Sequence, residues 1–422
     1  MLRAGSIFYT IVITLIIAII TSSLILYNYQ VGFYYQKLEQ QKRLLSNTTS
    51  AINLLLSNQD FVEANQSIKY DLFNTGNDTV VISRKYWGAF ELISASASFA
   101  TDTTYLSALT GANMNKSDLY SIYVADNNKQ LNFTGAPIIN GPAHMPIKGV
   151  GRANIAGMYY TGGNKLLNGA LLKSKQSLPK YNNNQLQEIV NGFNLNSYGQ
   201  GNEVINIAGS LIKDSIISQF NKPTTVIINE GSFALSEIKL KGKIVLFSTG
   251  VVTVANDASI EDVIIFAPSI VVEQNFQGNF QGFATDSVII NKNVKLNYPS
   301  MIGLIQTNNS STQSGIAIAK GTVIKGDVLA IKEPGLQNNI IGVRIDKGAT
   351  LLGNLYTNGF VELSGTVGGS VTCNNTRLTV GKAIYDNYLA TCKIDIGLLP
   401  ENYISSNLLY INNTKGIAKW LN

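Results

Sequence analysis

The sequence predicts a mainly β protein in which a right-handed parallel β-helix follows a long N-terminal transmembrane α-helix. Apolar runs recur roughly every twenty residues between Lys243 and Ile305, a spacing typical of a solenoid built from stacked turns of chain. The stretch Ser6–Leu26 is apolar and uncharged. A third stretch, Val343–Thr372, carries glycines about every six residues, with Ile, Leu or Val between them. These three patterns indicate an anchored β-solenoid.

The stretch Ser6–Leu26 is long enough to span a membrane. At about 1.5 Å per residue, a helix of this length crosses the ~30 Å hydrocarbon core. A cleaved signal peptide is the alternative, although Thr21–Ser23 is a poor cleavage site. Aromatic residues flank both ends of the stretch, as they do at membrane interfaces: Phe8, Tyr9, Tyr27, Tyr29, Phe33, Tyr34 and Tyr35. We expect an uncleaved single-pass anchor.

Charge counts and composition point in opposite directions for the orientation of this anchor. Arg3 precedes the span, whereas Lys37, Lys42 and Arg43 follow it, and this count alone favours a cytoplasmic body. Large domains, however, are translocated largely regardless of charge. An Asn-rich body with few charges also has the composition of an exported protein. We therefore expect the body on the non-cytoplasmic side of the cell membrane.

The anchor is predicted to continue as a helical stalk to about residue 57. Leu38, Leu45 and Ile52 follow at heptad spacing, which suggests self-association through the stalk. An apolar helix that runs into an amphipathic helix and then a β body resembles the N-terminus of type IV pilins and pseudopilins. That resemblance implies assembly into a pilus-like fibre. The sequence departs from the family in having no glycine directly before Phe8 and no glutamate between Met1 and Leu38.

The remaining chain divides into a β-rich region at 58–127, the solenoid at 128–398 and a C-terminal tail at 399–422. In the first region, Trp87, Phe90 and Ile93 are predicted to cap the open end of the solenoid. Gln130–Gly163 is expected to form one or two turns of it. An insertion near 165–200 should hold a short helix at Gln185–Phe193, because its apolar residues recur at helical spacing.

Aligned apolar runs support the stacking of the central turns. The first run of each repeat aligns across Ile244–Phe247, Val263–Phe266, Phe283–Ala284 and Met301–Ile305. The second aligns across Val251–Val254, Ile270–Val272 and Val288–Ile290. The glycine-spaced stretch Val343–Thr372 resembles bactofilin-like and hexapeptide-type β-helices. With the anchor and the Trp87 region, the C-terminal part also resembles a group of bacterial single-span envelope proteins, from which no activity can be transferred.

Composition and cysteine usage narrow the range of partners. Charged residues make up only 14% of the chain, below the roughly 25% of ordinary soluble domains. The sequence has no basic run and no aromatic-and-basic stripe of the kind that indicates nucleic-acid binding.

Cys373 and Cys392 lie nineteen residues apart, close to one predicted turn. Stacked turns sit about 4.8 Å apart, within the reach of a disulfide. A Cys373–Cys392 bridge is therefore possible, with two buried free thiols as the alternative.

No convergent catalytic, cofactor-binding or metal-binding set is evident in the sequence. The densest acidic group, Asp257, Glu261 and Asp262, has the pattern of a solvated corner, and neither Glu273 nor Asp286 repeats at the turn spacing. His144 lies between prolines and is predicted to be a turn residue. Gly365–Ser370 lacks the lysine and helix start of a phosphate-binding loop. We expect no enzyme activity, with a β-helix polysaccharide lyase or hydrolase as the alternative.

The predicted function is that of a membrane-anchored envelope protein that presents its β-helix for structural or adhesive interaction. Its expected partners are the membrane, other envelope proteins, the cell wall or surface glycans, with self-association through the stalk helix. A pilus-like or pseudopilus-like minor subunit is the second interpretation.

Overall fold

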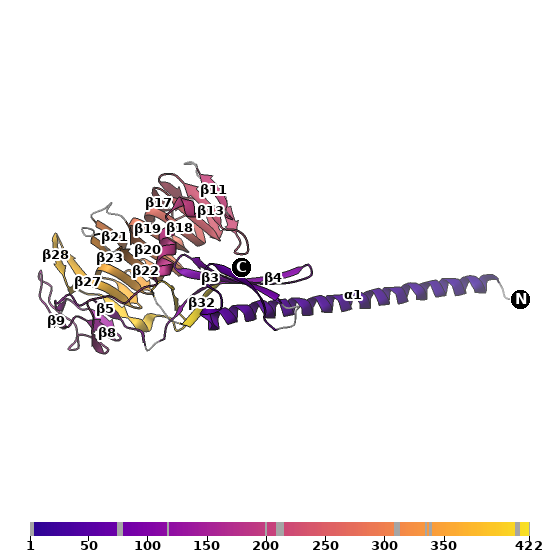
Figure 1. Ribbon diagram of the computed structural model, residues 1–422, viewed down its shortest axis with the longest axis horizontal. Helices are drawn as coiled ribbons and strands as arrows, with labels where there is room; N and C mark the ends of the chain where they lie inside the picture. The colour runs from indigo at the N-terminus through magenta and orange to yellow at the C-terminus, as the bar shows by residue number, and fades with distance from the viewer. Residues whose placement is uncertain are drawn as a thin grey trace. The chain divides into compact units, whose positions relative to one another are not determined.

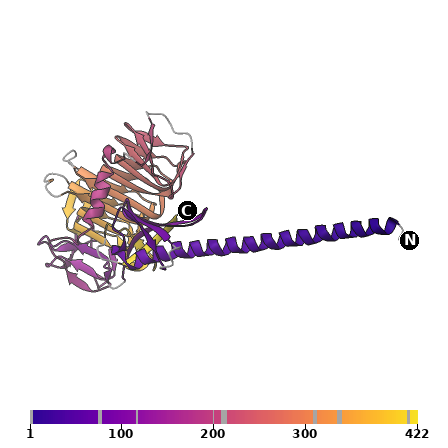
Figure 2. The ribbon, with the colours of Figure 1, turned by 45° about the vertical axis from the view of Figure 1, so that its right-hand side comes forward.

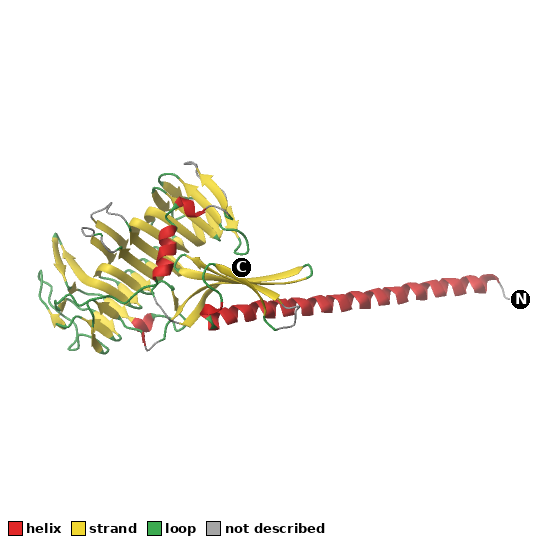
Figure 3. Ribbon diagram, in the orientation of Figure 1, coloured by secondary structure: helices red, strands yellow, loops and turns green. Residues whose placement is uncertain are grey.

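The protein is mainly β with one long N-terminal helix, as predicted (Figures 1 and 3). The computed structural model describes residues 4–73, 79–115, 118–198, 201–207, 215–307, 313–333, 336, 340–409 and 414–421. The chain forms two compact units. The first comprises Met1–Ser83 and Ser94–Leu106, and the second comprises Arg84–Ile93 and Ser107–Asn422.

The first unit contains α1 (Ala4–Ser57), an uninterrupted helix of 54 residues whose two halves differ. Apolar side chains in the first half are bare: Ile16 is 50% exposed and Ile25 is 69% exposed. In the second half, one face is buried, and its apolar members follow helical spacing: Leu44, Ala51, Ile52 and Leu55. Gln40 Nε2 donates to the carbonyl of Phe99 at 3.2 Å, which fixes this half beside the strands of its own unit.

The predicted heptad stripe is therefore not one continuous surface. Ile52 is fully buried, whereas Leu45 is 49% exposed and lies outside the packed face. A helix of 3.6 residues per turn drifts about 20° per heptad, so a packed face that includes Leu44, Ala51 and Leu55 excludes Leu45. The sequence identified the helix but not which of its faces packs.

A six-stranded sheet contains strands from both ends of the chain. Its order is β1–β2–β3–β4–β31, and β32 also pairs with β4. The strands are β1 (Gln66–Asp71), β2 (Thr79–Trp87), β3 (Phe90–Phe99), β4 (Asp102–Asn113), β31 (Ile404–Ser405) and β32 (Thr414–Leu421). β32 runs antiparallel to β4, with Trp420 opposite Ala108. The predicted C-terminal tail is thus an integral part of a sheet.

The remaining strands of the second unit are linked by pairing that closes into a barrel. Their pairings arrange them in three columns of parallel strands, and Figure 2 shows strands stacked along the body. The first column runs through β11 (Glu203–Ile207), β13 (Thr225–Asn229), β16 (Ile244–Ser248), β18 (Ser259–Val272), β19 (Gln277–Ile290), β20 (Lys295–Gln306), β22 (Val323–Lys332), β25 (Leu355–Leu363), β27 (Val371–Val380), β5 (Ile122–Val124), β8 (Ala143–Met145) and β10 (Leu171–Lys173).

The other two columns share the long strands of the first. The second adds β12 (Ser215–Ser218), β15 (Lys239–Gly242), β24 (Thr350–Leu352), β26 (Thr366–Gly368), β30 (Lys393–Asp395) and β7 (Ile138–Asn140). The third adds β14 (Phe233–Leu235), β17 (Val251–Val254), β21 (Gln313–Ile318) and β23 (Ile340–Ile345).

A few shorter elements complete the unit. β28 (Ala383–Asp386) pairs antiparallel with β27, and β29 (Tyr388–Leu389), β6 (Leu131–Phe133) and β9 (Val150–Arg152) form a separate three-stranded sheet. The helical elements are α2 (Asn183–Asn191) and the 3₁₀ turns η3 (Leu195–Tyr198) and η4 (Ile396–Leu398); η1 (Gln59–Phe61) belongs to the first unit.

The strand register confirms the predicted alignment of the central repeats. In the first column, Phe247 is opposite Phe266 and Phe266 is opposite Phe283. In the third, Val252 is opposite Ile270, which is opposite Val288. Inward-facing residues of all three columns form one buried apolar cluster. The alignment could be predicted from the sequence because equivalent positions in stacked strands need the same kind of side chain.

The order of the turns differs from the order in the sequence. β5 pairs with β27, with Ile122 opposite Val371, and β7 pairs with β30, with Ile138 opposite Lys393. The turns from residues 122 to 173 therefore lie beyond the C-terminal turns, as Figure 1 shows where violet β5 and β8 lie beside yellow β27. The segment between β10 and β11 must then run back along the columns.

This returning segment covers the outward-facing side chains of the first column. Those side chains form a second apolar cluster with Leu186 and Ile189 of α2. Three aromatic pairs follow the segment along the column: Tyr181 with Tyr356, Phe193 with Phe266, and Tyr198 with Phe247, at centroid distances of 5.6, 5.1 and 6.3 Å. The predicted insertion is thus a packed crossover, and its predicted helix is confirmed within two residues at each end.

The region around Trp87 covers the same flank rather than the end of the columns. Trp87 and Phe90 belong to the second cluster, and Trp87 packs edge-on against Phe220 at 5.8 Å. Gln281, at an outward position of the first column, donates to the carbonyl of Trp87 at 3.0 Å and accepts from the amide of Ala89 at 2.8 Å. The prediction of an end cap was wrong, because outward apolar side chains also need cover.

Candidate functional site

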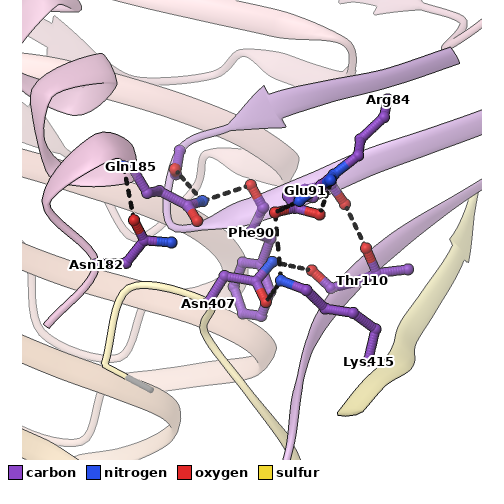
Figure 4. Close-up of polar contacts among 9 residues, drawn as sticks. Arg84, Phe90, Glu91, Thr110, Asn182, Gln185, Asn407 and Lys415 are labelled. Atoms are coloured by element: carbon purple, nitrogen blue, oxygen red, sulfur yellow. Dashed lines mark hydrogen bonds and ion pairs between the residues drawn. The ribbon is translucent and has the colours of Figure 1, made fainter. Parts of the chain in front are cut away.

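A buried polar cluster forms around Glu91, the second residue of β3 (Figure 4). Arg84 Nε and Nη2 donate to the two carboxylate oxygens of Glu91, each at 2.9 Å. Lys415 Nζ, from β32, lies 3.2 Å from Glu91 Oε1 and also contacts Asn407 Oδ1. Glu91 is 2% exposed and Asn407 is 1% exposed. The Glu91 carboxylate thus forms ion pairs with two cationic side chains, and solvent hardly reaches it.

Burial and charge act in opposite directions on the ionisable groups of this cluster. Burial alone raises the pKa of Glu91, but the hydrogen bonds and charges of Arg84 and Lys415 outweigh it and hold the pKa below its ordinary value. Burial lowers the pKa of Lys415, although Glu91 opposes that shift. The carboxyl is therefore an anion at neutral pH, beside an amine that loses its proton more readily than an exposed lysine.

Neighbouring elements hold the cluster rigidly. Asn407 Nδ2 donates to the carbonyl of Thr110 at 3.1 Å, and the Asn407 amide donates to Ala89 at 3.0 Å. Gln185 of α2 donates to the carbonyl of Phe90 at 2.7 Å, and Asn182 caps the start of that helix. The backbone carbonyls of the two residues that precede Glu91 are thus fixed by hydrogen bonds, and Figure 4 shows the bond from Gln185 to Phe90.

A second buried acid, Asp327, is held without a cation among the contacts of the described residues. Its oxygens accept from the hydroxyls of Tyr403 and Ser405 at 2.8 and 2.7 Å, and from the amide of Ser406 at 2.7 Å. The amide of Asn354 adds a bond of 2.9 Å. These donors satisfy the oxygens of a carboxylate that is 1% exposed. The arrangement docks the segment 403–406 onto the first column.

The acidic group noted in the sequence is neutralised by lysines. Lys419 Nζ lies 3.0 Å from Glu261 and 2.7 Å from Asp262, and Lys241 lies 2.9 Å from Glu261. Asp257 instead accepts from the amide of Glu237 at 3.1 Å. Among the described residues, no group of three or more His, Cys, Asp or Glu side chains is arranged to hold a metal ion.

His144 lies in a strand, so the prediction of a turn residue was wrong. It belongs to β8, opposite Tyr123 of β5, and its ring stacks on Tyr123 at 5.2 Å and lies edge-on to Tyr120 at 5.5 Å. The flanking prolines suggested a turn, but they lie outside the three-residue strand. The histidine continues the outward-facing aromatic column.

Cys373 and Cys392 are free, buried thiols, the second of the two alternatives that the sequence left open. Cys373 stacks between Thr357 and Val124 in the first column, whereas Cys392 precedes β30 of the second column. Nineteen residues therefore do not place the two at equivalent positions of neighbouring turns. Burial raises the pKa of each thiol to about 12, so neither is a reactive thiolate at neutral pH.

A polar groove of about 430 Å³ lies beside the crossover segment. Tyr356 anchors it, because the Tyr356 hydroxyl donates to the carbonyl of Pro179 at 2.9 Å. Amide, lysine and tyrosine side chains line the groove: Gln176, Lys180, Tyr181, Asn183, Tyr356 and Asn374. Aromatic faces with amide donors and acceptors are groups that suit a neutral sugar.

Among the residues that the structure describes, one helix, α1, is long and apolar enough to cross a membrane. Its apolar half is not covered by protein, in contrast to the buried face of its second half. The position of this apolar helix was predictable from composition alone. The Glu91 and Asp327 clusters were not, because their members are isolated polar residues in separate parts of the sequence.

No protein-family model matches the chain, and the comparison with curated proteins gives no match. Among solved structures, the chain is similar to the competence-associated pilin ComZ from Thermus thermophilus, at 10% identity over 85% of this chain and 86% of that one, with a TM-score of 0.23. A TM-score this low carries no argument about fold or function.

Proposed function

We propose that this protein is a single-pass, membrane-anchored envelope protein whose β body presents a binding surface rather than a catalytic site. In this proposal the closed parallel barrel is a right-handed β-helix, held on the non-cytoplasmic side of the cell membrane. Its partners are envelope proteins, the cell wall or surface glycans. The expectation that it is not an enzyme is part of the proposal.

The bare apolar half of α1 is the observation that carries the proposal. Side chains such as Ile16 and Ile25 are half or more exposed, and transferring them from water to lipid is favourable by about 25 cal/mol for each Å² of apolar surface. A contiguous bare surface of this kind is rare on a soluble monomer. Lipid supplies the missing cover.

Membrane fractionation tests the anchor directly. In the full chain, Ile16→Arg combined with Ile20→Arg should release the protein from washed membranes, since each arginine at the centre of a span costs roughly 2.5–3.5 kcal/mol. Leu45→Arg is the matched control, because Leu45 is exposed on the other half of the same helix. The anchor proposal fails if the double variant remains in the membrane fraction as fully as the control.

Protease protection tests the orientation. Protease added to spheroplasts should degrade the body while the inner membrane is intact. Cleavage only after the membrane is lysed would place the body in the cytoplasm and overturn this part of the proposal.

Among the partners, surface glycans are favoured by the groove beside Tyr356. We expect Tyr181→Ala and Asn374→Ala to weaken retention of the detergent-solubilised full chain on the polysaccharides that bind it, because they remove a sugar-stacking face and an amide. Asn184→Ala, one residue from the groove residue Asn183, is the matched control. If all three variants are retained equally, the binding surface lies outside this groove.

A pilus-like subunit is the second candidate, and the continuity of α1 favours it. A single helix runs from the apolar half into the packed half without a break. In a pilus-like assembly, other copies of this helix would cover the bare half. Sequencing the mature N-terminus distinguishes the two candidates. A new, methylated N-terminus within the first seven residues would support the pilus-like subunit, and an intact Met1 would exclude that processing.

The third candidate, a polysaccharide lyase or hydrolase, predicts release of reducing ends from a polysaccharide panel. We expect none, because Glu261 and Asp262 are engaged by lysines. Activity that disappears in Asp262→Asn would replace the proposal of a non-catalytic surface.

A further inference from the structure

The side-chain amine of Lys415 lies against the side-chain amide of Asn407. Lys415 Nζ contacts the side-chain amide oxygen of Asn407, so the amine lies beside the amide carbon Cγ. Asn407 is buried, at 1% exposed, and Lys415 is partly buried, with 12% of its side chain exposed. A desolvated lysine held against a carbonyl carbon has the proximity and orientation that nucleophilic addition requires.

Glu91 is positioned to move the proton that this addition releases. Its Oε1 lies 3.2 Å from Lys415 Nζ, at the limit of the distance expected for a general base. Arg84 holds both carboxylate oxygens at 2.9 Å, which fixes the orientation of the carboxylate. Asn407 Nδ2, the other group on Cγ, points away toward the carbonyl of Thr110.

The charge of Lys415 can be lost without leaving Glu91 unpaired. Arg84 and Lys415 share one buried carboxylate, and buried charges are stable only when each is compensated. If the lysine became a neutral amide, Glu91 would keep its two-pronged pairing with Arg84.

We propose that Lys415 and Asn407 condense to form an intramolecular isopeptide bond, with Glu91 as the proton carrier. Glu91 takes a proton from the Lys415 ammonium, and the neutral Nζ adds to Asn407 Cγ. The bond between Cγ and Nδ2 then breaks as Glu91 passes to the leaving nitrogen both this proton and the second proton that Nζ gives up. The products are a secondary amide and one ammonium ion, so atoms and charge balance without an oxidant or cofactor.

The bond joins β32 to the segment that Asp327 docks. Asn407 lies directly after Ser405 and Ser406, which bind Asp327, and Lys415 lies opposite Ala112 of β4. A covalent link here prevents β32 from separating from the body. This inference stands independently of the proposed function, because it concerns the chain's own chemistry.

Mass spectrometry of the purified, detergent-solubilised full chain tests the bond. Trypsin should fail to cleave after Lys415, and the peptide from Ile394 to Lys419 should weigh one ammonia less than its sequence. Both signs are needed, because cyclisation of an asparagine to a succinimide also releases ammonia but leaves Lys415 cleavable. Normal cleavage after Lys415 in the wild-type protein, with no mass loss, would overturn the proposal.

Three variants assign the roles. Asn407→Ala and Lys415→Arg should give unlinked peptides of full mass, and Glu91→Gln should reduce the linked fraction at least tenfold. Lys419→Arg is the matched control, since Lys419 is also an ion-paired lysine of β32, and it should remain linked. A wild-type extent of linkage in Glu91→Gln would remove Glu91 from the mechanism.

Discussion

Glu91 and Asp327 are both buried acids of the second unit, but their charges are compensated in opposite ways. Glu91 is bound by two cationic side chains, Arg84 and Lys415. Asp327 is bound by hydroxyls and amides, most of them from the segment 403–406. Each acid fixes a part of the C-terminal region, one holding β32 and the other the segment that precedes it.

The difference teaches how each contact should respond to perturbation. A cluster of charges depends on every member, because removing one leaves another buried without compensation. Neutral donors compensate a buried charge through several weaker hydrogen bonds, so the loss of one bond lowers the stability less. We therefore expect the Glu91 cluster to be the more fragile of the two and the more sensitive to pH.

Glu91→Ala is expected to have the largest effect. It leaves Arg84 and Lys415 buried without their carboxylate, and breaking a buried pair in this way costs about 3–5 kcal/mol. Denaturant unfolding of the detergent-solubilised full chain measures the loss. Glu203→Ala, at an exposed glutamate of β11, is the control and should change stability by no more than about 0.5 kcal/mol.

Asp327→Asn is expected to cost less, about 1–3 kcal/mol, because the shape is kept and part of the hydrogen bonding survives. The new amide group meets donors such as the amide of Ser406, and one of these donors loses its acceptor. The same unfolding measurement applies. The comparison of the two acids would be reversed if Asp327→Asn were more destabilising than Glu91→Ala.

Acidification should act through Glu91. The pKa of its carboxyl is lower in the folded protein than its ordinary value of 4.5, so its contribution is present above that value and is lost as the pH falls through the folded-state pKa. Each unit of difference corresponds to about 1.4 kcal/mol. Unfolding free energies measured between pH 7 and pH 3 should fall more steeply in the wild type than in Glu91→Gln, and parallel curves would contradict the prediction.

Lys419→Met should have the smallest effect. Lys419 and Glu261 have 28% and 40% of their side chains exposed, and solvent-exposed pairs contribute roughly 0–1 kcal/mol. The Asp262 side chain is only 6% exposed, but it keeps a hydrogen bond of 3.0 Å from Asn279 Nδ2 when Lys419 is replaced. The difference from the wild type should shrink further when unfolding is repeated at high salt. If Lys419→Met lowered the free energy of unfolding as much as Glu91→Ala, the greater exposure of Lys419 would not explain the difference predicted between the two clusters.

The sequence located the features that repeat locally. The central turns were aligned correctly from Ile244 to Ile305, because each inward position needs an apolar side chain. It misjudged features whose partners are distant, such as the order of the turns and the flank that Trp87 covers. Lys415 and Glu91 lie 324 residues apart, so no periodicity connects them.

The amino-acid sequence by itself determined the apolar helix, the β-rich body and the spacing of its turns, since each follows from the local alternation of apolar and polar residues. Only the tertiary structure decided that residues 122–173 stack beyond β27, that α2 covers the outward aromatic column, and that Glu91, Asn407 and Lys415 meet. Parallel strands present the same backbone pattern to any neighbour. Side-chain packing over the whole chain therefore selects which turn follows which.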